Sequence, residues 1–305
     1  MPTRLRNALS AALIALSCLL VPFGALAAWV TYGLADTGRY VATMAPLAAD
    51  PAVQGAVADS VEAGIMHEVD DLLEASPTAP EPGIVRPFID DAVRSFTRTE
   101  AFRTAWEAGN RAVHDAVLRA LQDGRERTVT VDLAPVTAQV KRRLTDDHVP
   151  FAHRIPVEHT AVPVLPADEL ERLRKGYDVL EVAGFWLPVS AAVLAATGIA
   201  VAACRRRAVT ATALGTALGG AFLALAVAIG RRLTVADVPE AAYRPAAGAI
   251  YDALTGTLRT VSWLLVVLGL TVALACRLTE FLARRRRASA GPAADPTQEP
   301  TRARA

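Results

Sequence analysis

Three histidines, His148, His153 and His159, fall in one proline-rich stretch near the middle of the chain. Asp146 and Asp147 precede them, so imidazole and carboxylate groups that can ligate a metal ion are present. A zinc site needs spacings that turn its ligands toward one ion, and these gaps, interrupted by proline, match no such pattern. We therefore interpret the histidines as surface or packing residues, with a metal site as the alternative.

A second cluster of possible metal ligands comprises His67, Glu68, Asp70 and Asp71. These residues could ligate a divalent cation, but they also suit the polar end of a helix, which is the interpretation we favour. The sequence thus predicts neither a metal site nor a cofactor.

Trp106, Asn110 and His114 follow one another at four-residue steps along the edge of an apolar stripe, in a helix predicted over 99–122. A neutral histidine and an asparagine in such positions either bond to neighbouring backbone or mark the edge of a functional surface. We favour the structural interpretation and keep the functional edge as the alternative.

No local catalytic motif is present: there is no G-x-S-x-G, P-loop, Rossmann glycine pattern or CxxC pair. A hydrolase whose two carboxylates are brought together by folding would leave no local signature. The basic run Lys141-Arg142-Arg143 lies in an acidic segment without interleaved aromatic residues, which argues against a nucleic-acid partner. No catalytic residue is predicted.

The elements that carry these residues divide into apolar and acidic segments. Of the 305 residues, 52% are hydrophobic, and the whole chain has a formal charge of only +1. Residues 31–178 nevertheless contain 24 acidic and 16 basic side chains and so carry a charge of −8. The cysteines, Cys18, Cys204 and Cys276, lie in or beside apolar runs, so no disulfide can staple the acidic segment. That segment must fold by burying a core.

Four apolar runs have about the twenty residues that a membrane-spanning helix needs. They cover residues 8–34, 179–204, 208–230 and 258–282. In the first run, Ala25-Leu26-Ala27 is a pattern that signal peptidase cuts, and Ser17-Cys18 hints at a lipoprotein site. Because this run is about twice the usual length of a signal peptide's apolar region, an uncleaved anchor is favoured. All three interpretations export the segment that follows.

Arginine clusters predict the orientation, because short loops rich in arginine remain in the cytoplasm. Residues 205–207 form a tight turn between the second and third runs, and a second cluster follows the fourth. Residues 1–7 and the compositionally disordered tail 283–305 are then cytoplasmic in a multi-pass plasma-membrane protein, whereas 35–178 and 231–257 are exported. The clusters are Arg205, Arg206, Arg207, Arg284, Arg285, Arg286 and Arg287.

The exported segment 35–178 is predicted to be mostly helical. Nothing interrupts its last helix before the second apolar run, so that helix should continue into the membrane. The fold class is therefore mainly α: a four-helix transmembrane part and an extracytoplasmic helical domain with one or two short strands. Helices are expected from Asp50-Pro51, from Pro87, over 99–122, from Ala134 and from Asp168, and strands over 128–131 and 160–165.

Two features inside the spans bear on helix packing. Pro188 removes one backbone donor and should kink the second span. Gly215-x-x-x-Gly219, with Gly220 beside it, is typical of a close-packing face for another helix, within the chain, in a second copy or in another membrane protein. These glycines could instead line a pore, but no ionisable residue lies in the interior of the second or third run.

The layout and several short strings resemble a family of uncharacterised four-span integral membrane proteins of actinomycetes. The resemblance covers nearly the whole chain except the tail, and it implies location and architecture but no catalytic residues. The strings that carry it are Arg39-Tyr40-Val41, Pro46-Leu47-Ala48, Asp50-Pro51-Ala52-Val53-Gln54, Phe102, Trp106, Asn110-Arg111, His114, Val131-Asp132-Leu133-Ala134-Pro135, Trp186-Leu187-Pro188 and Arg205–Arg207.

Taken together, these patterns favour a membrane-anchored exported domain with a structural, scaffolding or sensing role in the cell envelope, in contact with the lipid bilayer. A cell-envelope hydrolase is one alternative. A small transporter or channel component is another, and it would need a polar path through the spans lined by Thr210, Thr212 and Thr216.

Overall fold

The computed structural model describes residues 3–74, 82–123, 129–132, 138, 141–142, 145, 161–165 and 167–289, and these are predominantly helical. Four helices are long and apolar enough to cross a membrane: Arg4–Leu34, Glu171–Val201, Arg205–Asp237 and Ala241–Arg286. The mainly helical class and the four spans are therefore confirmed. The chain is a multi-pass membrane protein in contact with the lipid bilayer.

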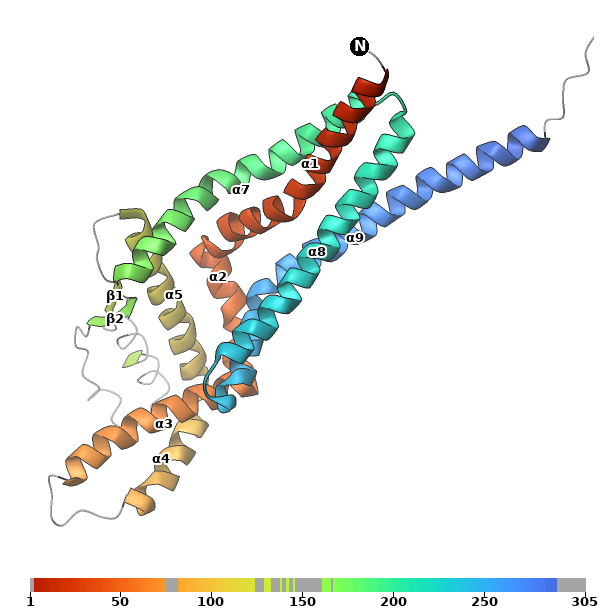
Figure 1. Cartoon of the computed structure of the whole chain (residues 1–305). Coiled ribbons are helices and arrows are strands. Elements are labelled where there is room, and N and C mark those ends of the chain that lie inside the picture. Colours follow the sequence, from red (N-terminus) through yellow and green to blue (C-terminus); the bar gives the residue numbers. More distant parts are fainter. Residues whose placement is uncertain are drawn as a thin grey trace, which may run out of the picture.

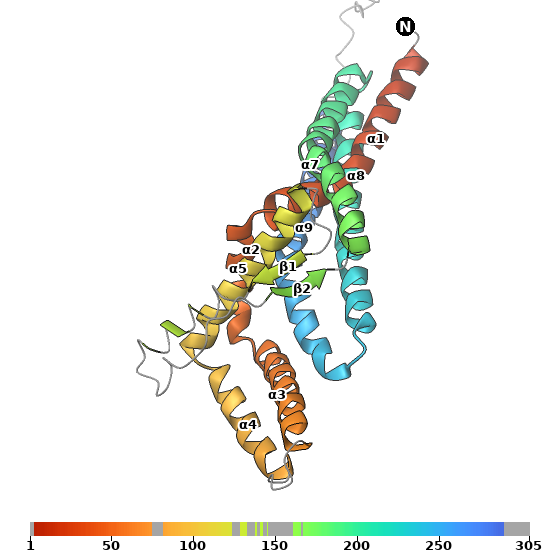
Figure 2. The same cartoon turned by 90° about the vertical axis from the view of Figure 1, so that its left-hand side faces the viewer.

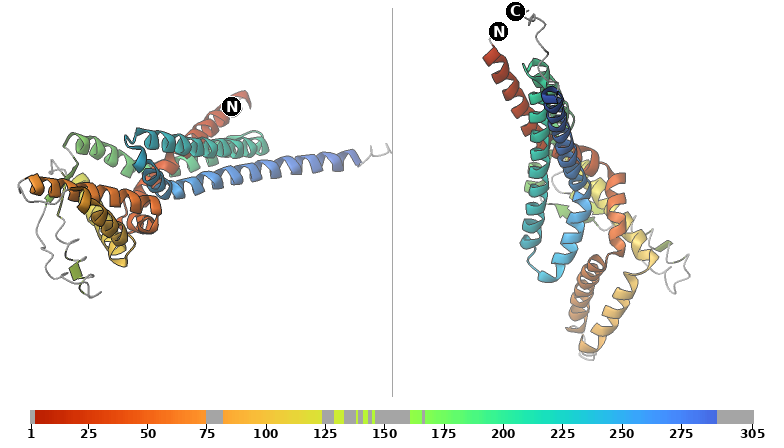
Figure 3. Two further views of the ribbon diagram at one scale, coloured as in Figure 1. Left: turned by 90° about the horizontal axis from the view of Figure 1, so that it is seen from below. Right: turned by 90° about the vertical axis from the view of Figure 1, so that its right-hand side faces the viewer.

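The membrane bundle consists of α1 (Thr3–Trp29), α7 (Ala167–Val201), α8 (Arg205–Asp237) and α9 (Arg244–Ser289). α1 packs along α7 and also on α8, and α8 pairs with α9 (Figure 1). The start of α1, the α7–α8 turn and the end of α9 lie on the same side of the molecule (Figure 3). We call this side the turn end, and the opposite side, which carries α3 and α4, the domain end.

The α7–α8 turn is displaced from its expected position. Residues 205–207 were predicted to form it, but Arg205 begins α8, and the turn lies at 202–204. Cys204 has the extended backbone of a helix N-cap, with φ −123° and ψ 90°. The three arginines therefore form the first turn of α8. Pro188 lies inside α7, which runs without interruption from the outer segment into the span, as the sequence predicted.

Between α1 and α7 the chain builds a domain of short and medium helices. A π-helix, η1 (Val30–Leu34), ends the first span, and Asp36 then caps α2 by accepting a hydrogen bond from the Arg39 amide at 2.8 Å. Asp50 caps α3 in the predicted way, since its carboxylate accepts from the amides of Ala52 and Val53. The domain helices are α2 (Thr37–Met44), η2 (Ala45–Ala49), α3 (Pro51–Glu74), α4 (Pro82–Phe96) and α5 (Glu100–Asp123).

The α4 helix starts earlier than predicted, at Pro82 rather than Pro87. Pro87 lies one turn inside it, where only the backbone bond to Gly83 is lost, so the helix continues. Two short strands, β1 (Val129–Asp132) and β2 (Ala161–Leu165), pair antiparallel. A 3-10 turn, η4 (Ala241–Tyr243), precedes α9. Most of the helix expected from Ala134, and all three of His148, His153 and His159, lie outside the described residues.

The α1–α7 interface is a seam of small residues at seven-residue spacing. Ser10, Ser17, Gly24 and Thr31 recur along the first span, opposite a matching series on α7: Gly184, Ala191 and Gly198. Seven residues are two helical turns, so each series forms one stripe along its helix. Small side chains allow the two backbones to approach closely.

Hydroxyl groups link the two backbones along this seam. The Oγ atoms of Ser10 and Ser17 each donate to an α7 carbonyl, Gly198 and Ala191 respectively, at 2.7 Å. Farther along, Thr31 Oγ1 donates to the Leu180 carbonyl at 3.1 Å. A Cβ added at Gly24 would lie 3.1 Å from the backbone nitrogen of Pro188. Each interhelical hydrogen bond in a membrane contributes about 0.6 kcal/mol, so the seam depends on close packing as well as on hydrogen bonds.

Gly184→Leu should therefore lower the free energy of unfolding by about 1–3 kcal/mol, because a Cβ at that position would lie 2.8 Å from Thr31 Cβ. Thermal unfolding of the purified protein in detergent measures the effect. The matched control is Val193→Leu, also on α7, whose side chain is 56% exposed on the bundle surface. Equal unfolding temperatures for the two variants would show that the seam does not hold α7 against α1.

Candidate functional site

Trp106, Asn110 and His114 lie on the face of α5 that contacts α2, where the first span enters the domain. Trp106 Nε1 donates to the Met44 carbonyl at 2.8 Å. Asn110 Nδ2 donates to the Trp106 carbonyl at 2.8 Å, and its Oδ1 accepts from the Tyr40 hydroxyl at 3.4 Å. Burial raises the pKa of Tyr40, which favours the protonated phenol that makes this bond. The three residues thus join α5 to α2.

His114 connects α5 to the end of the first span. Its ring stacks on Tyr40 with centroids 4.2 Å apart, and its Nε2 lies 2.8 Å from the Leu34 carbonyl. Because a carbonyl can only accept, Nε2 carries the hydrogen of that bond. Nδ1 lies 3.1 Å from Thr37 Oγ1, which also lies 2.7 Å from Asp115 Oδ1.

The Thr37 hydroxyl has one hydrogen for these two neighbours. That hydrogen goes either to Nδ1 of His114 or to the Asp115 carboxylate. The cluster therefore has two alternative hydrogen-bond arrangements.

Beneath this cluster lies a core shared by the membrane bundle and the domain, which we call the junction core. Its buried members are Met44, Leu47 and Val53 from the domain and Ala246 from α9. Trp106, Tyr40 and Val57 pack against it from the domain, and Ala249, Ile250, Ala253 and Leu254 from α9. The core thus combines side chains of α2, η2, α3, α5 and the fourth span.

Polar contacts fix the same stretch of α9 to the other spans. Trp29 Nε1 of α1 donates to the Leu254 carbonyl at 3.2 Å, and the Tyr251 hydroxyl donates to the Val227 carbonyl of α8 at 3.0 Å. Arg231 of α8 pairs with Asp252 at 2.9 Å, and Arg259 pairs with the same carboxylate at 2.7 Å. The sequence predicts that Arg231 lies on the exported side, although arginines near spans are more common on the cytoplasmic side. Its charge is paired with a carboxylate on the neighbouring helix.

The start of α7 holds the other end of α5. Arg174 donates to the carbonyls of Ala120 and Leu121, at 2.6 and 3.4 Å. These carbonyls belong to the last turn of α5, where a cation also opposes the negative end of the helix dipole. Tyr177 packs nearby against the buried Ala116, Ala120 and Leu121.

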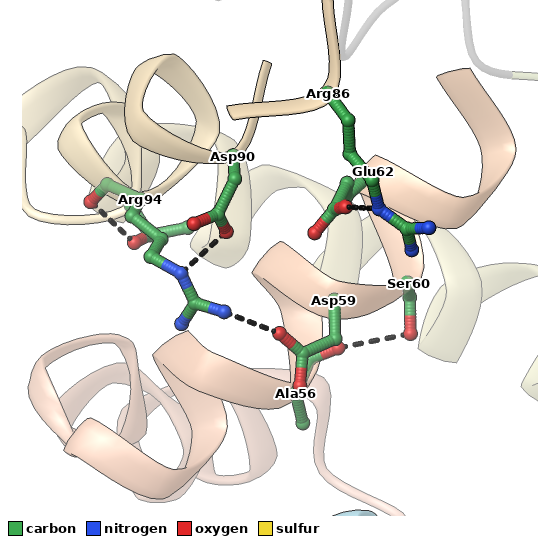
Figure 4. A network of polar contacts seen from close by, with 8 residues as sticks. Ala56, Asp59, Ser60, Glu62, Arg86, Asp90 and Arg94 are labelled. Carbon is green, nitrogen blue, oxygen red and sulfur yellow. Dashed lines mark hydrogen bonds and ion pairs between the residues drawn. The ribbon is translucent and has the colours of Figure 1, made fainter. Parts of the chain in front are cut away.

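The α3–α4 hairpin projects from the junction at the domain end (Figure 2). Arg94 of α4 contacts both Asp59 of α3 and Asp90, and Arg86 pairs with Glu62 of α3 at 2.8 Å (Figure 4). The hydrogen bond to Asp90 raises the pKa of Arg94. A network of this kind fixes the relative position of two helices better than an isolated surface pair.

Between these helices is an almost entirely apolar groove of about 310 Å³, which we call the hairpin groove. It lies next to the junction core, since Val57 borders both. Its lining residues are Val57, Val61, Ile65, Ala92, Val93, Phe96, Thr97 and Phe102.

The glycines singled out in the third span contact other helices of the same chain. Gly215 and Gly219 face α1, where Cβ atoms would lie 2.9 Å from Cys18 Cβ and 3.3 Å from the Cys18 carbonyl. Gly220 faces α9, at 2.8 Å from the Ser262 carbonyl. The glycine face of α8 is thus covered within one chain.

The remaining candidates are dispersed. Arg205, Arg206 and Arg207 begin α8, and Arg284, Arg285, Arg286 and Arg287 lie near the end of α9. Among the three threonines of the transporter hypothesis, Thr210 lines a cleft between these two segments, whereas the Thr212 hydroxyl donates to the Ala208 carbonyl. Within the described part of the chain, no three of the His, Cys, Asp and Glu side chains are grouped closely enough to hold a metal ion.

The chain matches no protein-family model, no curated protein and no solved structure.

Trp106→Ala should lower the free energy of unfolding by about 3 kcal/mol, because it removes a large ring from the junction core and leaves the Met44 carbonyl without its donor. Trp106→Phe keeps most of the ring and should cost about 1 kcal/mol. Unfolding in mixed micelles of increasing SDS content measures both.

Phe88→Ala is the control for loss of an aromatic ring, because Phe88 is 76% exposed on α4 and its removal should change stability little. A Trp106→Ala protein as stable as the Phe88→Ala protein would contradict the assignment of Trp106 to a shared core.

Proposed function

We propose that this protein holds an extracytoplasmic helical domain in a fixed position on the plasma membrane, in a scaffolding or sensing role in the cell envelope. The observation that carries the proposal is the junction core. A domain that is merely tethered would be joined to its anchor by a flexible linker with few contacts. Here α9 and the domain share one set of buried side chains, so the domain cannot tilt freely without opening that core.

The proposed orientation places both termini in the cytoplasm. The turn end carries the arginine clusters, and arginine-rich short segments remain on the cytoplasmic side. The domain end would then lie outside the plasma membrane. Arg231 fits this orientation because it is neutralised by Asp252.

The surface that such a scaffold presents is the hairpin groove. It belongs to the α3–α4 hairpin, which extends past the α8–α9 connection at the domain end (Figure 2). In the proposed orientation its apolar lining is therefore not covered by lipid. We propose that its occupant is an apolar segment of another envelope protein. A partner of this kind needs no contact with Gly215 or Gly219, which α1 already covers.

The fixed position can be tested by distances between spin labels on the exposed positions Ala63 of α3 and Leu225 of α8, each changed to Cys in a protein whose three native cysteines are changed to Ser. We expect a narrow distance distribution in nanodiscs, and a broad one after Trp106→Ala. A broad distribution in the otherwise wild-type protein would show a tethered domain and contradict the proposal.

Orientation is checked in intact cells with two single-cysteine proteins, one that carries Ala63→Cys without the native cysteines and one that keeps only the native Cys204. A membrane-impermeant thiol reagent should label Ala63→Cys but leave the exposed native Cys204 unlabelled until the membrane is permeabilised. The reverse pattern would place the domain in the cytoplasm and rule out an envelope role.

A further inference from the structure

At the turn end, α8 and α9 diverge (Figure 1). Their side chains line a cleft of about 780 Å³. This volume falls within the range of small-ligand sites. The cleft lies where the arginines of α8 give way to the apolar run that starts at Ala208. It therefore lies at the boundary between the apolar span and its basic flank, the depth at which lipid headgroups are found.

The cleft has a strong excess of positive charge. Arg206 and Arg207 line it from α8, and Arg277 and Arg284 from α9. Glu280 is the single carboxylate among the described lining residues, and Arg284 binds it. Glu280 also attracts Arg277 and Arg207 electrostatically, but among the described residues it forms an ion pair with neither, and Arg206 has no ion-pair partner. Three guanidinium groups at the cleft thus have capacity for an anion, and guanidinium binds phosphate oxygens in pairs.

Exposed apolar side chains continue from the cleft toward the domain end along both helices. On α8, Leu214 lines the cleft and Leu218, one turn farther, is 73% exposed. On α9, Leu278 and Leu274 follow in the same direction and are 54% and 69% exposed. A ligand with a phosphate at one end and long apolar chains at the other matches this arrangement of charge and hydrophobic surface.

We propose that the cleft between α8 and α9 at the turn end binds the headgroup of an anionic phospholipid, whose acyl chains lie along the exposed leucines. The arginines supply the selectivity for negative charge, and the leucines distinguish a lipid from a soluble phosphate. The site is independent of the hairpin groove and of the proposed envelope role, because it depends only on α8 and α9. In the proposed orientation it takes its lipid from the cytoplasmic leaflet, which is rich in anionic lipid.

Native mass spectrometry of the purified full-length protein tests this assignment. Phosphatidylglycerol and phosphatidylcholine with the same acyl chains are titrated into the detergent-solubilised protein. We expect tighter binding of phosphatidylglycerol, and a binding about fivefold weaker in Arg206→Gln and in Arg277→Gln. Phosphatidylcholine binding should be unchanged in both variants.

Arg232→Gln is the matched control, since Arg232 lies on the same helix at the domain end, away from the cleft. Arg277→Gln leaves both arginine clusters intact, so its effect cannot come from altered membrane orientation. A second measurement uses only the wild type: phosphatidylglycerol should raise its thermal unfolding temperature more than phosphatidylcholine does.

Equal affinity for the two lipids, or an equal loss in Arg232→Gln, would overturn the assignment. Displacement of phosphatidylglycerol from the wild type by millimolar inorganic phosphate would also overturn it, because the cleft would then be a site for free phosphate rather than lipid.

Discussion

The packing of the domain on the outer part of α9 is the interaction on which the rest of the architecture depends. α9 has 46 residues and is about 69 Å long at 1.5 Å per residue, whereas the hydrocarbon core of a bilayer is about 30 Å thick. A bilayer can therefore cover only part of α9, and in the proposed arrangement the stretch that contains Ile250 and Leu254 lies beyond the lipid. Met44, Leu47 and Val53 cover this stretch instead.

The same stretch of α9 is fixed to every other span through a short series of contacts. Hydrogen bonds of Trp29 and Tyr251 join it to α1 and α8. Asp252 forms ion pairs with Arg231 of α8 and Arg259 of α9. The seam of small residues then joins α1 to α7, whose outer part binds the end of α5 through Arg174. These contacts connect all four spans to one another and to the domain. A change in the position of one span can therefore be transmitted to the domain. The two hydrogen-bond arrangements of His114, Thr37 and Asp115 lie where the first span enters the domain.

Local patterns predicted the helices well, because apolar run length, proline and capping residues act over one or two turns. The start of α3, the continuity of α7 and the four spans all follow from such patterns. The α4 start was placed at Pro87 because a proline early in a helix resembles a helix start. The turn was placed on Arg205–Arg207 because charge, not backbone geometry, was the signal there.

The contacts between distant segments were less accessible from the sequence. Trp106, Asn110 and His114 were recognised as a group, but their partners Met44, Tyr40 and Leu34 lie more than sixty residues away. The α1–α7 seam did have a signal, the seven-residue spacing of Ser10, Ser17, Gly24 and Thr31. This series mixes serine, glycine and threonine, so it is harder to recognise than the Gly215-x-x-x-Gly219 pattern of α8. The cleft at the turn end could not be predicted from the sequence, because it depends on the angle between α8 and α9.

Hydrogen exchange of the full-length protein in nanodiscs tests the central claim, that the domain and the outer part of α9 form one cooperative unit. Amides in α2, in the first half of α3 and in residues 244–254 of α9 should exchange with a common opening free energy. Trp106→Ala should lower that energy for all three segments together. Fast exchange across α2 and α3 beside a protected outer α9, unaffected by the substitution, would show that the domain folds and opens independently of the span.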